Sequence, residues 1–525
     1  METFAKVCRS EASPREPRVG EFNAPSSRYR AFAHPAVDEL KPKVVRGGVV
    51  AVCAQGAKLV LQTVTTMLLA RLLFPEDFGL LGMTVVLTGF FGYFKDAGLS
   101  AATVQRPEVT QEQISTLFWI NVAVGAALAT FTAILAPVLV AFYGEPRLYW
   151  ITVVLGAGFV FSGLAAQHQA LIVREMRFVT LAKVEVLSLT ISSVAGVVMA
   201  LLGWSYWALV GMAVAGSIAS AAATWVANPW VPGLPRRKCG VRSMLHFGWM
   251  ATCNNLVVFL AWNLDNILLG RFWGAHALGL YGRAYQLATL PVHQLNGAIS
   301  GVAFPALSRI QEDADRLARS FLRGYSLLVS LTIPIAISCA LFAEEIVGVV
   351  LGAKWMEAAP ILRLLAPTIL VFALVNPISW LVISTGQIRR ALSITVATTP
   401  LVILGIVIGL SYGPKGVALG YSLAMALLVI PIIAWSIQGT RITWAGIWRA
   451  IKQPLLSGLW AGASGLIVKI VLGAVLAPIA LMLVGLGFVL GVYAWVLLIA
   501  MGKKDLYVDL LTQVFRGSSL RPKFN

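Results

Sequence analysis

Fourteen mostly apolar stretches follow one another along the chain, and short polar breaks separate them. Each stretch is long enough for one helix to cross the hydrocarbon core of a bilayer, which takes about 20 apolar residues. Because a segment in lipid must satisfy its own backbone hydrogen bonds, we expect each stretch to be helical. The predicted helices are 47–72, 79–102, 115–141, 149–172, 181–203, 206–228, 245–270, 278–303, 322–343, 359–384, 391–411, 415–437, 447–472 and 477–501.

The composition agrees with a chain that faces lipid over most of its surface. Of its 525 residues, 58% are hydrophobic and only 12% are charged, and the mean hydropathy is +0.80. Soluble domains carry about a quarter charged residues. We therefore predict an all-α polytopic membrane protein with about 14 transmembrane helices.

The distribution of positive charge predicts the orientation in the membrane. Cytoplasmic loops collect Lys and Arg. An even number of helices places both termini on one side, and most of the 41 Lys and Arg residues fall on that side. We expect the inner membrane, with both termini cytoplasmic. Because the net charge of +18 is spread over loops, nucleic-acid binding is not expected.

The two ends of the chain are polar. Residues 1–45 are rich in proline and contain no apolar core of signal-peptide length, so they are expected to form a disordered cytoplasmic tail. Residues 504–525 are expected to form a second cytoplasmic tail. The five cysteines form no close pair, and we interpret them as small apolar fillers rather than disulfides or metal ligands.

The chain repeats itself at an offset of 200 residues. The two copies start at the first and the seventh predicted helix, so an even number of spans separates them and both copies cross the membrane in the same direction. This is a parallel repeat, typical of transporters that work by alternating access. The matching residues are Leu68, Leu69, Arg71, Gly79, Leu80 and Gly82 in one copy and Leu268, Leu269, Arg271, Gly279, Leu280 and Gly282 in the other.

The repeat predicts the domain organisation. Each copy forms a lobe of six helices, and the two lobes enclose a central path. The predicted parts are the N-lobe at 46–228, a cytoplasmic linker at 229–244, the C-lobe at 245–437, and two appended helices at 438–503.

Polar side chains inside the first predicted helix mark one part of a candidate path, because such groups are costly in lipid and usually serve transport. Gln55, Lys58 and Gln62 lie on one helix face, at spacings of three and four. Lys58 lies near the middle of the bilayer, where its ammonium cannot easily reach the interface. We interpret Lys58 as attracting an anionic substrate group; a structural pairing with a carbonyl or an acid is the alternative.

The matching face of the seventh predicted helix carries Asn255, Trp262 and Asp265. Asp265 and Arg283 flank the next turn at a similar depth, so we predict an ion pair that either pins the two helices or acts as a gate. A buried acid can also bind a proton or a sodium ion, so ion coupling through Asp265 remains open.

Three further arginines lie at the predicted outer interface. Arg71 and Arg271 close the first and seventh helices, and Arg363 lies within about one turn of the interface. We interpret them as anchors, with a role at the outer mouth left open. No histidine spacing suits a metal, and no glycine-rich loop precedes a Lys-Ser/Thr pair. We therefore expect no catalytic residues, no metal, no ATPase engine and no cofactor beyond a coupling ion.

Several strings of residues carry a family resemblance. They are 70–73, 78–79 and 96–99 in the first repeat, and 263–271, 279–281, 283–287, 305–309, 351–355 and 358–360 in the second. Together they resemble the polysaccharide transporter family of the multidrug/oligosaccharidyl-lipid/polysaccharide exporter superfamily, in the branch of colanic-acid and teichuronic-acid exporters. The resemblance covers roughly residues 44–505.

The resemblance implies a flippase for an undecaprenyl-pyrophosphate-linked oligosaccharide, used in exopolysaccharide, capsule or lipopolysaccharide biosynthesis. It also implies coupling to an ion gradient. The implied partners are the lipid-linked oligosaccharide, membrane lipids and a polysaccharide polymerase machinery.

Two other functions remain open. A drug exporter or peptidoglycan-precursor flippase could share the fold, although exporters of cationic drugs prefer acidic cavities, and Lys58 and Arg283 are basic. A membrane polysaccharide polymerase or ligase would carry catalytic histidines in a long outer loop. The longest predicted outer loop, 344–358, contains no histidine.

Overall fold

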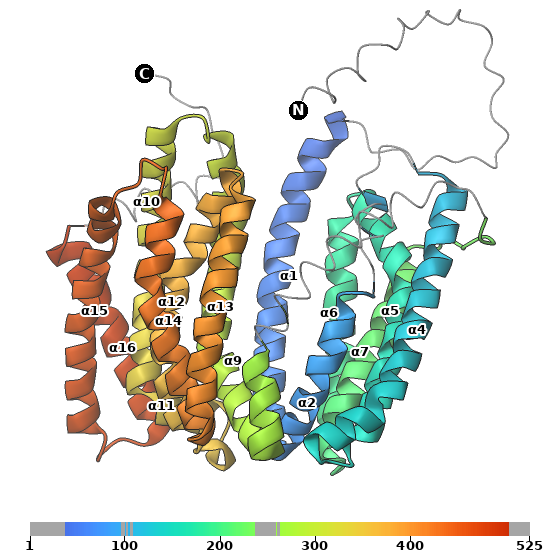
Figure 1. The fold of residues 1–525 in the computed structure, drawn as a ribbon, viewed down its shortest axis with the longest axis horizontal. Coiled ribbons are helices and arrows are strands. Elements are labelled where there is room, and N and C mark those ends of the chain that lie inside the picture. Colours follow the sequence, from blue (N-terminus) through green and yellow to red (C-terminus); the bar gives the residue numbers. More distant parts are fainter. Residues whose placement is uncertain are drawn as a thin grey trace, which may run out of the picture.

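The structure, a computed structural model, describes residues 37–95, 100, 103–104, 109–236, 259 and 263–502. Throughout these ranges the regular elements are helices (Figure 1). The long ones are α1 Val37–Leu72, α2 Pro75–Gly92, α4 Gln111–Tyr143, α5 Leu148–Arg174, α6 Phe178–Leu201, α7 Tyr206–Ala227, α9 Leu264–Arg309, α10 Ala314–Leu341, α12 Ala358–Ser384, α13 Ile388–Leu410, α14 Gly413–Ile437, α15 Trp444–Leu472 and α16 Pro478–Trp495. Three short ones are α11 Ala343–Val350, η2 Ala353–Trp355 and η3 Val496–Ala500.

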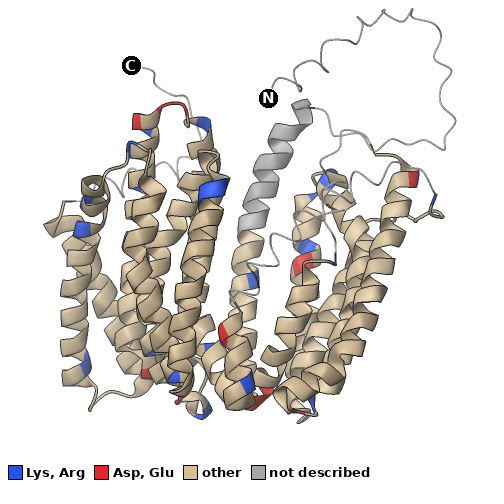
Figure 2. Ribbon diagram, in the orientation of Figure 1, with Lys and Arg blue, Asp and Glu red and all other residues tan. Residues whose placement is uncertain are grey.

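Ten of the described helices are long and apolar enough to cross a bilayer. Among the described residues, the charged ones are concentrated towards the two ends of the bundle, with few between them (Figure 2). This confirms the prediction of an all-helical, multi-pass membrane protein. Helix bounds for the predicted segments within 115–228 and 359–501 agree with the prediction to within four residues, when α16 and η3 are taken together for the last segment.

The first helix is longer than its apolar segment. It begins at Val37, inside the stretch 1–45 for which a disordered tail was expected, and not at residue 47. Hydropathy marks the part of a helix that lies in lipid, and a helix can continue beyond that part. The start of α1 therefore could not be read from the apolar pattern.

The predicted loop between the seventh and eighth helices is reduced to one residue. Helix α9 runs from Leu264 to Arg309, and only Gly274 departs from helical geometry, with φ 78° and ψ −176°. A residue without a Cβ adopts such a positive φ without strain, so a single glycine reverses the chain. The predicted segment 322–343 also differs, because α10 begins at Ala314, eight residues earlier, and the short helix α11 follows its end at Leu341.

The helices form two groups, which Figure 1 shows side by side. In the first group α4 packs on α5, α6 packs on α7 and α1 packs on α6. In the second, α9 and α10 pack on α12, α13 packs on α14, and α15 packs on α10 and α16. The main contact between the groups joins α2 to α9. A large buried cluster at this junction includes Leu69, Tyr281 and Trp355.

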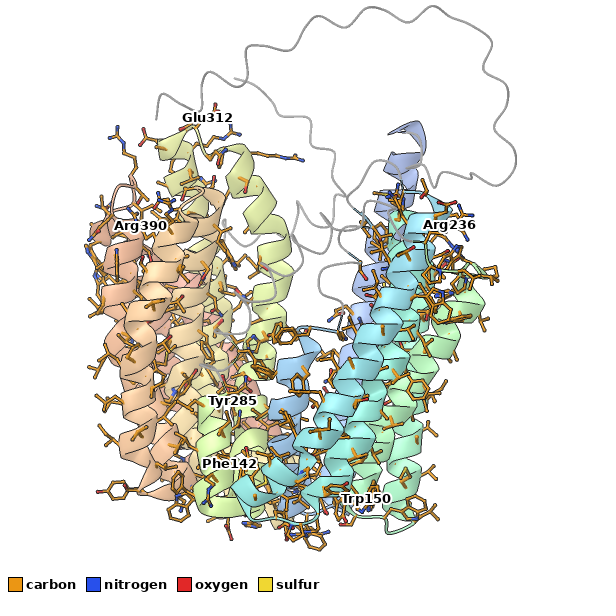
Figure 3. All side chains as sticks on the ribbon, turned by 45° about the vertical axis from the view of Figure 1, so that its right-hand side comes forward. Phe142, Trp150, Arg236, Tyr285, Glu312 and Arg390 are labelled. Atoms are coloured by element: carbon orange, nitrogen blue, oxygen red, sulfur yellow. The ribbon has the colours of Figure 1, made fainter. Side chains whose placement is uncertain are left out.

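The two ends of the bundle are the tail side and, opposite it, the far side. Arg236, Glu312 and Arg390 lie on the tail side, where α1 begins, and Phe142 and Trp150 lie on the far side (Figure 3). The first and second groups are in contact through α2 and α9 towards the far side (Figure 1).

Close contacts at glycine hold neighbouring helices together, as is common where helices pack in lipid. In the α4–α5 pair, a Cβ on Gly125 would lie 2.5 Å from the carbonyl oxygen of Phe159. In the α13–α14 pair, a Cβ on Gly405 would lie 2.6 Å from the carbonyl oxygen of Gly420. These helix crossings therefore leave no room for a side chain.

Candidate functional site

Helix α9 supplies charges to two separate cavities. Asp265, which is 5% exposed, lines a cavity of about 210 Å³ inside the second group, between α9, α12, α13 and α14. Arg283 lines another cavity of about 210 Å³, which lies between α2 and α9 at the junction of the two groups. The predicted Asp265–Arg283 ion pair is therefore wrong.

The direction of each side chain around the helix explains why the pair does not form. Asp265 and Arg283 each lie nine residues from Gly274, which is about two and a half helical turns. The sequence thus gives their common depth but not their directions. Successive helical residues point about 100° apart. Asn266, next to Asp265, accordingly lines the cavity of Arg283 rather than that of Asp265.

The Asp265 carboxylate is held by two hydrogen bonds. The Tyr281 hydroxyl donates to Oδ2 at 2.7 Å, and the backbone N–H of Asn266 donates to Oδ1 at 2.8 Å. Tyr281 stacks on Tyr285, whose ring meets Tyr421 edge to face. The cavity adds amide and hydroxyl groups to an otherwise apolar wall. These come from Asn376, Ser379, Thr395, Thr398, Thr399, Tyr421 and Ser436.

Arg283 lines its cavity without an acidic partner from the described helices. Its Cζ lies 4.1 Å from the centroid of the Phe78 ring, and its Nη1 donates to Oε1 of Gln286. Asn263, Asn266 and Gln286 line the same cavity. A guanidinium can bind phosphate oxygens through paired N–H donors, and amides can bind hydroxyl groups. This cavity is therefore suited to an anionic, hydroxylated ligand.

Lys58 has an acidic partner that was not among the predicted site residues. Its Nζ lies 2.5 Å from Oε2 of Glu185 in α6, and the two side chains are 25% and 38% exposed. Of the two interpretations of Lys58, the pairing with an acid is the one that the structure contains. Glu185 could have been found, since it is an acid inside a predicted span. Gln55 and Gln62 are exposed on α1.

The three arginines predicted at the outer interface have different surroundings. Nη2 of Arg71 donates to the carbonyl oxygen of Val349 at 2.7 Å, across the junction of the two groups. Arg271 also contacts the other group, with its Cζ 5.8 Å from the centroid of the Phe142 ring. Arg363 stays within its own group and forms a salt bridge to Glu344 at 2.9 Å. Asn255 and Trp262 lie outside the described residues.

Comparison with known proteins identifies related sequences. A family profile described as "Polysaccharide biosynthesis protein" matches residues 68–360, which is more than half of the chain. The lipopolysaccharide biosynthesis protein WzxC of Escherichia coli is 27% identical, over 74% of this chain and 80% of WzxC. The teichuronic acid biosynthesis protein TuaB of Bacillus subtilis is 29% identical over 56% of this chain, and the match spans 61% of TuaB.

Further similarities agree with these. The succinoglycan biosynthesis transport protein ExoT of Rhizobium meliloti is 24% identical, over 79% of this chain and 82% of ExoT. Among solved structures, the lipid II flippase MurJ in an inward closed conformation matches with a TM-score of 0.68 and 14% identity, over 88% of this chain and all of MurJ. An inward-facing multidrug transporter of the MATE family matches with a TM-score of 0.55. The chain therefore shares their fold.

Proposed function

The chain belongs to the polysaccharide biosynthesis protein family, and from this premise we propose that it is a flippase for lipid-linked oligosaccharide. It moves an undecaprenyl-pyrophosphate-linked oligosaccharide across the inner membrane for exopolysaccharide, capsule or lipopolysaccharide biosynthesis. The names of its relatives, which refer to teichuronic acid, lipopolysaccharide and succinoglycan, support the polysaccharide role. ExoT is named as a transport protein, which supports translocation.

The observation that carries this proposal is the cavity of Arg283. A pyrophosphate-linked sugar presents negative charge beside many hydroxyl groups, and it crosses a bilayer only along a polar path. At the junction of the two helix groups, Arg283 offers a cation whose charge no described acid offsets, beside the amides of Asn266 and Gln286. The guanidinium binds the pyrophosphate, and the amides bind the first sugar.

The proposal includes the finer layout predicted from the repeat. Fourteen helices form two six-helix lobes, 46–228 and 245–437, joined by the linker 229–244 and followed by two appended helices at 438–503. The two helix groups support this layout. Both termini are cytoplasmic, so the tail side faces the cytoplasm and the far side faces the periplasm. Rocking of the lobes exposes the Arg283 cavity to each side in turn.

Lys58 is a secondary cation of the same path. Because Glu185 neutralises it at 2.5 Å, Lys58 attracts an anion only when this pair separates. Gln55 and Gln62, exposed on the same helix, line the approach to the cavity.

The Asp265 cavity provides the coupling to an ion gradient. Its carboxylate can take up a proton, and with the oxygens of Asn376 and Thr395 it can also bind a sodium ion. Substrate and coupling ion thus occupy different cavities on one helix, and a movement of α9 links them.

A drug exporter of the same fold is less well supported. A cationic drug would be repelled by the Arg283 guanidinium. A peptidoglycan precursor carries the same pyrophosphate, so the cavity would accept it, and the names of the relatives favour surface polysaccharides. A polymerase or ligase activity finds no support among these relatives, and we propose the polymerase machinery only as a partner.

Deletion of the gene tests the proposal. In a strain without a second transporter of this kind, we expect lipid-linked oligosaccharide to accumulate in the cytoplasmic leaflet, because its headgroup has no polar path across the bilayer. Leaflet-resolved analysis of the glycolipid in spheroplasts measures this. Expression of the wild-type chain should restore transfer, and normal transfer in the deletion strain would contradict the proposal.

A further inference from the structure

On the far side, α2 and α9 meet in two equivalent contacts, whose residues are 200 positions apart in the sequence. A Cβ on Gly79 would lie 1.7 Å from the carbonyl oxygen of Ala275, and a Cβ on Gly279 would lie 1.8 Å from the carbonyl oxygen of Pro75. Residues 75 and 275, and residues 79 and 279, are equivalent in the sequence repeat. The contact is therefore reciprocal, like the interface of a symmetric dimer.

This contact accepts no side chain on either glycine. The neighbouring atoms are backbone carbonyl oxygens, which cannot rotate away as a side chain can. An alanine at residue 79 or 279 would force α2 and α9 apart at the point where the two groups meet. Gly282, three residues after Gly279, has no atom within 4 Å of a built Cβ. Alanine should therefore fit at residue 282, and Gly282→Ala is a matched control for Gly279→Ala.

The turn 349–355 of the second group contacts the end of α1. The indole Nε1 of Trp355 donates to the carbonyl oxygen of Ala70 at 2.7 Å, and Nζ of Lys354 lies 3.5 Å from that of Leu72. The last four carbonyl groups of a helix have no partner within the helix. Two of those in α1 are thus satisfied by residues of the other group, and Arg71 adds its bond to Val349.

The equivalent position in the second repeat is held differently. Arg271 contacts the Phe142 ring at 5.8 Å, and a Cβ on Gly270 would lie 2.8 Å from Cε1 of Tyr143. Within the described ranges, no hydrogen bond joins Arg271 to the first group. On the far side, the end of α1 is therefore held to the second group by hydrogen bonds. Arg271 and Gly270, at the equivalent position, contact the first group by packing alone.

Residues of the junction also line the Arg283 cavity. Phe78 and Gly279 line that cavity, and Phe78 packs edge to face on Trp355 with ring centroids 5.2 Å apart. We therefore expect a ligand that leaves the cavity towards the far side to pass between these groups.

We infer that Gly79 and Gly279 form a reciprocal gate that closes the far side of the path, and that the turn 349–355 is the latch on this gate. The inference rests on the proposed function for the direction of transport, but the closure of the gate is a property of the protein alone. Release to the far side requires that the two glycine contacts separate and that the end of α1 loses its partners from the turn.

Thiol labelling of the cavity tests the gate without transport. Val85, which is 47% exposed and lines the Arg283 cavity, is replaced by cysteine in a chain whose native cysteines are replaced by alanine. A membrane-impermeant maleimide is then added from the periplasmic side. We expect slow labelling with both glycines present, and labelling at least about tenfold faster in Gly279→Ala. Gly282→Ala, the matched control, should label at the slow rate.

A second pair of variants covers the case in which Gly279→Ala does not fold. Arg71 is exposed, so Arg71→Ala should fold and lose the bond to Val349; we expect labelling about threefold faster. Arg271→Ala, the equivalent variant in the second repeat, should change the labelling rate less.

Unchanged labelling in folded Gly279→Ala or in Arg71→Ala overturns the gate. A failure of the flippase proposal would instead appear in the leaflet analysis and leave these labelling rates as expected.

Discussion

The two cavities beside α9 differ in the charge that lines them, although one helix supplies both charges. The Asp265 cavity is enclosed by the second group and surrounds its acid with hydroxyl and amide groups. The Arg283 cavity lies where the two groups meet and places its cation beside Phe78 of the first group. In the proposed mechanism, the acid responds to an ion without touching the substrate, and the cation binds a substrate whose path runs between the groups.

The largest effect is expected from loss of the cation. Arg283→Gln should lower oligosaccharide export about 10- to 100-fold, because a hydrogen bond to a charged group contributes about 1.5–3 kcal/mol. Export is measured as surface polysaccharide in the complemented deletion strain. Arg283→Lys should retain part of the activity, since it keeps the charge but loses the paired donors. Arg363→Gln is the matched control and should export normally; a normal Arg283→Gln would contradict the difference between the cavities.

A smaller and different effect is expected at the acid. Asp265→Asn keeps the size of the side chain and an acceptor for Tyr281 but removes the charge. Export should fall about tenfold and lose its dependence on the ion gradient, because a neutral amide neither binds a proton nor attracts a cation. Transport in vesicles with and without an imposed proton or sodium gradient measures this. If Asp265→Asn weakened substrate binding as much as Arg283→Gln, the two cavities would not be separate in function.

The smallest effect is expected at the Lys58–Glu185 pair in the first group. Lys58→Ala alone leaves Glu185 as an unpaired charge in a half-buried position and should lower the melting temperature of the purified protein. The double variant with Glu185→Ala should recover part of the loss, since partly exposed pairs contribute about 1 kcal/mol or less. Export by Lys58→Ala should fall less than by Arg283→Gln. Equal losses in stability for the single and double variants would count against the pair.

The apolar pattern predicted most of the described helices but not how they face one another. Lipid requires about 20 apolar residues per span, so the pattern located segments such as α7 and α14 to within two residues. It could not show that α9 turns at Gly274 alone, because a glycine with positive φ leaves no mark in hydropathy. It also could not separate Asp265 from Arg283, since depth in the membrane was known and direction around the helix was not.

Contacts between distant parts of the chain were the other unpredicted feature. Glu185 lies 127 residues from Lys58, and no local spacing links the two. The repeat did identify Gly79 and Gly279 as equivalent residues, but their reciprocal contact with residues 275 and 75 required the arrangement of α2 against α9. The short turn 349–355, predicted only as an outer loop, provides partners for the end of α1.

The most direct test of the account is substrate binding at the cation. Purified protein in nanodiscs is titrated with an undecaprenyl-pyrophosphate-linked oligosaccharide, and its dissociation constant is compared between the wild type, Arg283→Gln and Asp265→Asn. We predict that Arg283→Gln binds at least about tenfold more weakly, a change of about 1.4 kcal/mol or more, while Asp265→Asn binds like the wild type. Equal affinities of the wild type and Arg283→Gln would contradict the account.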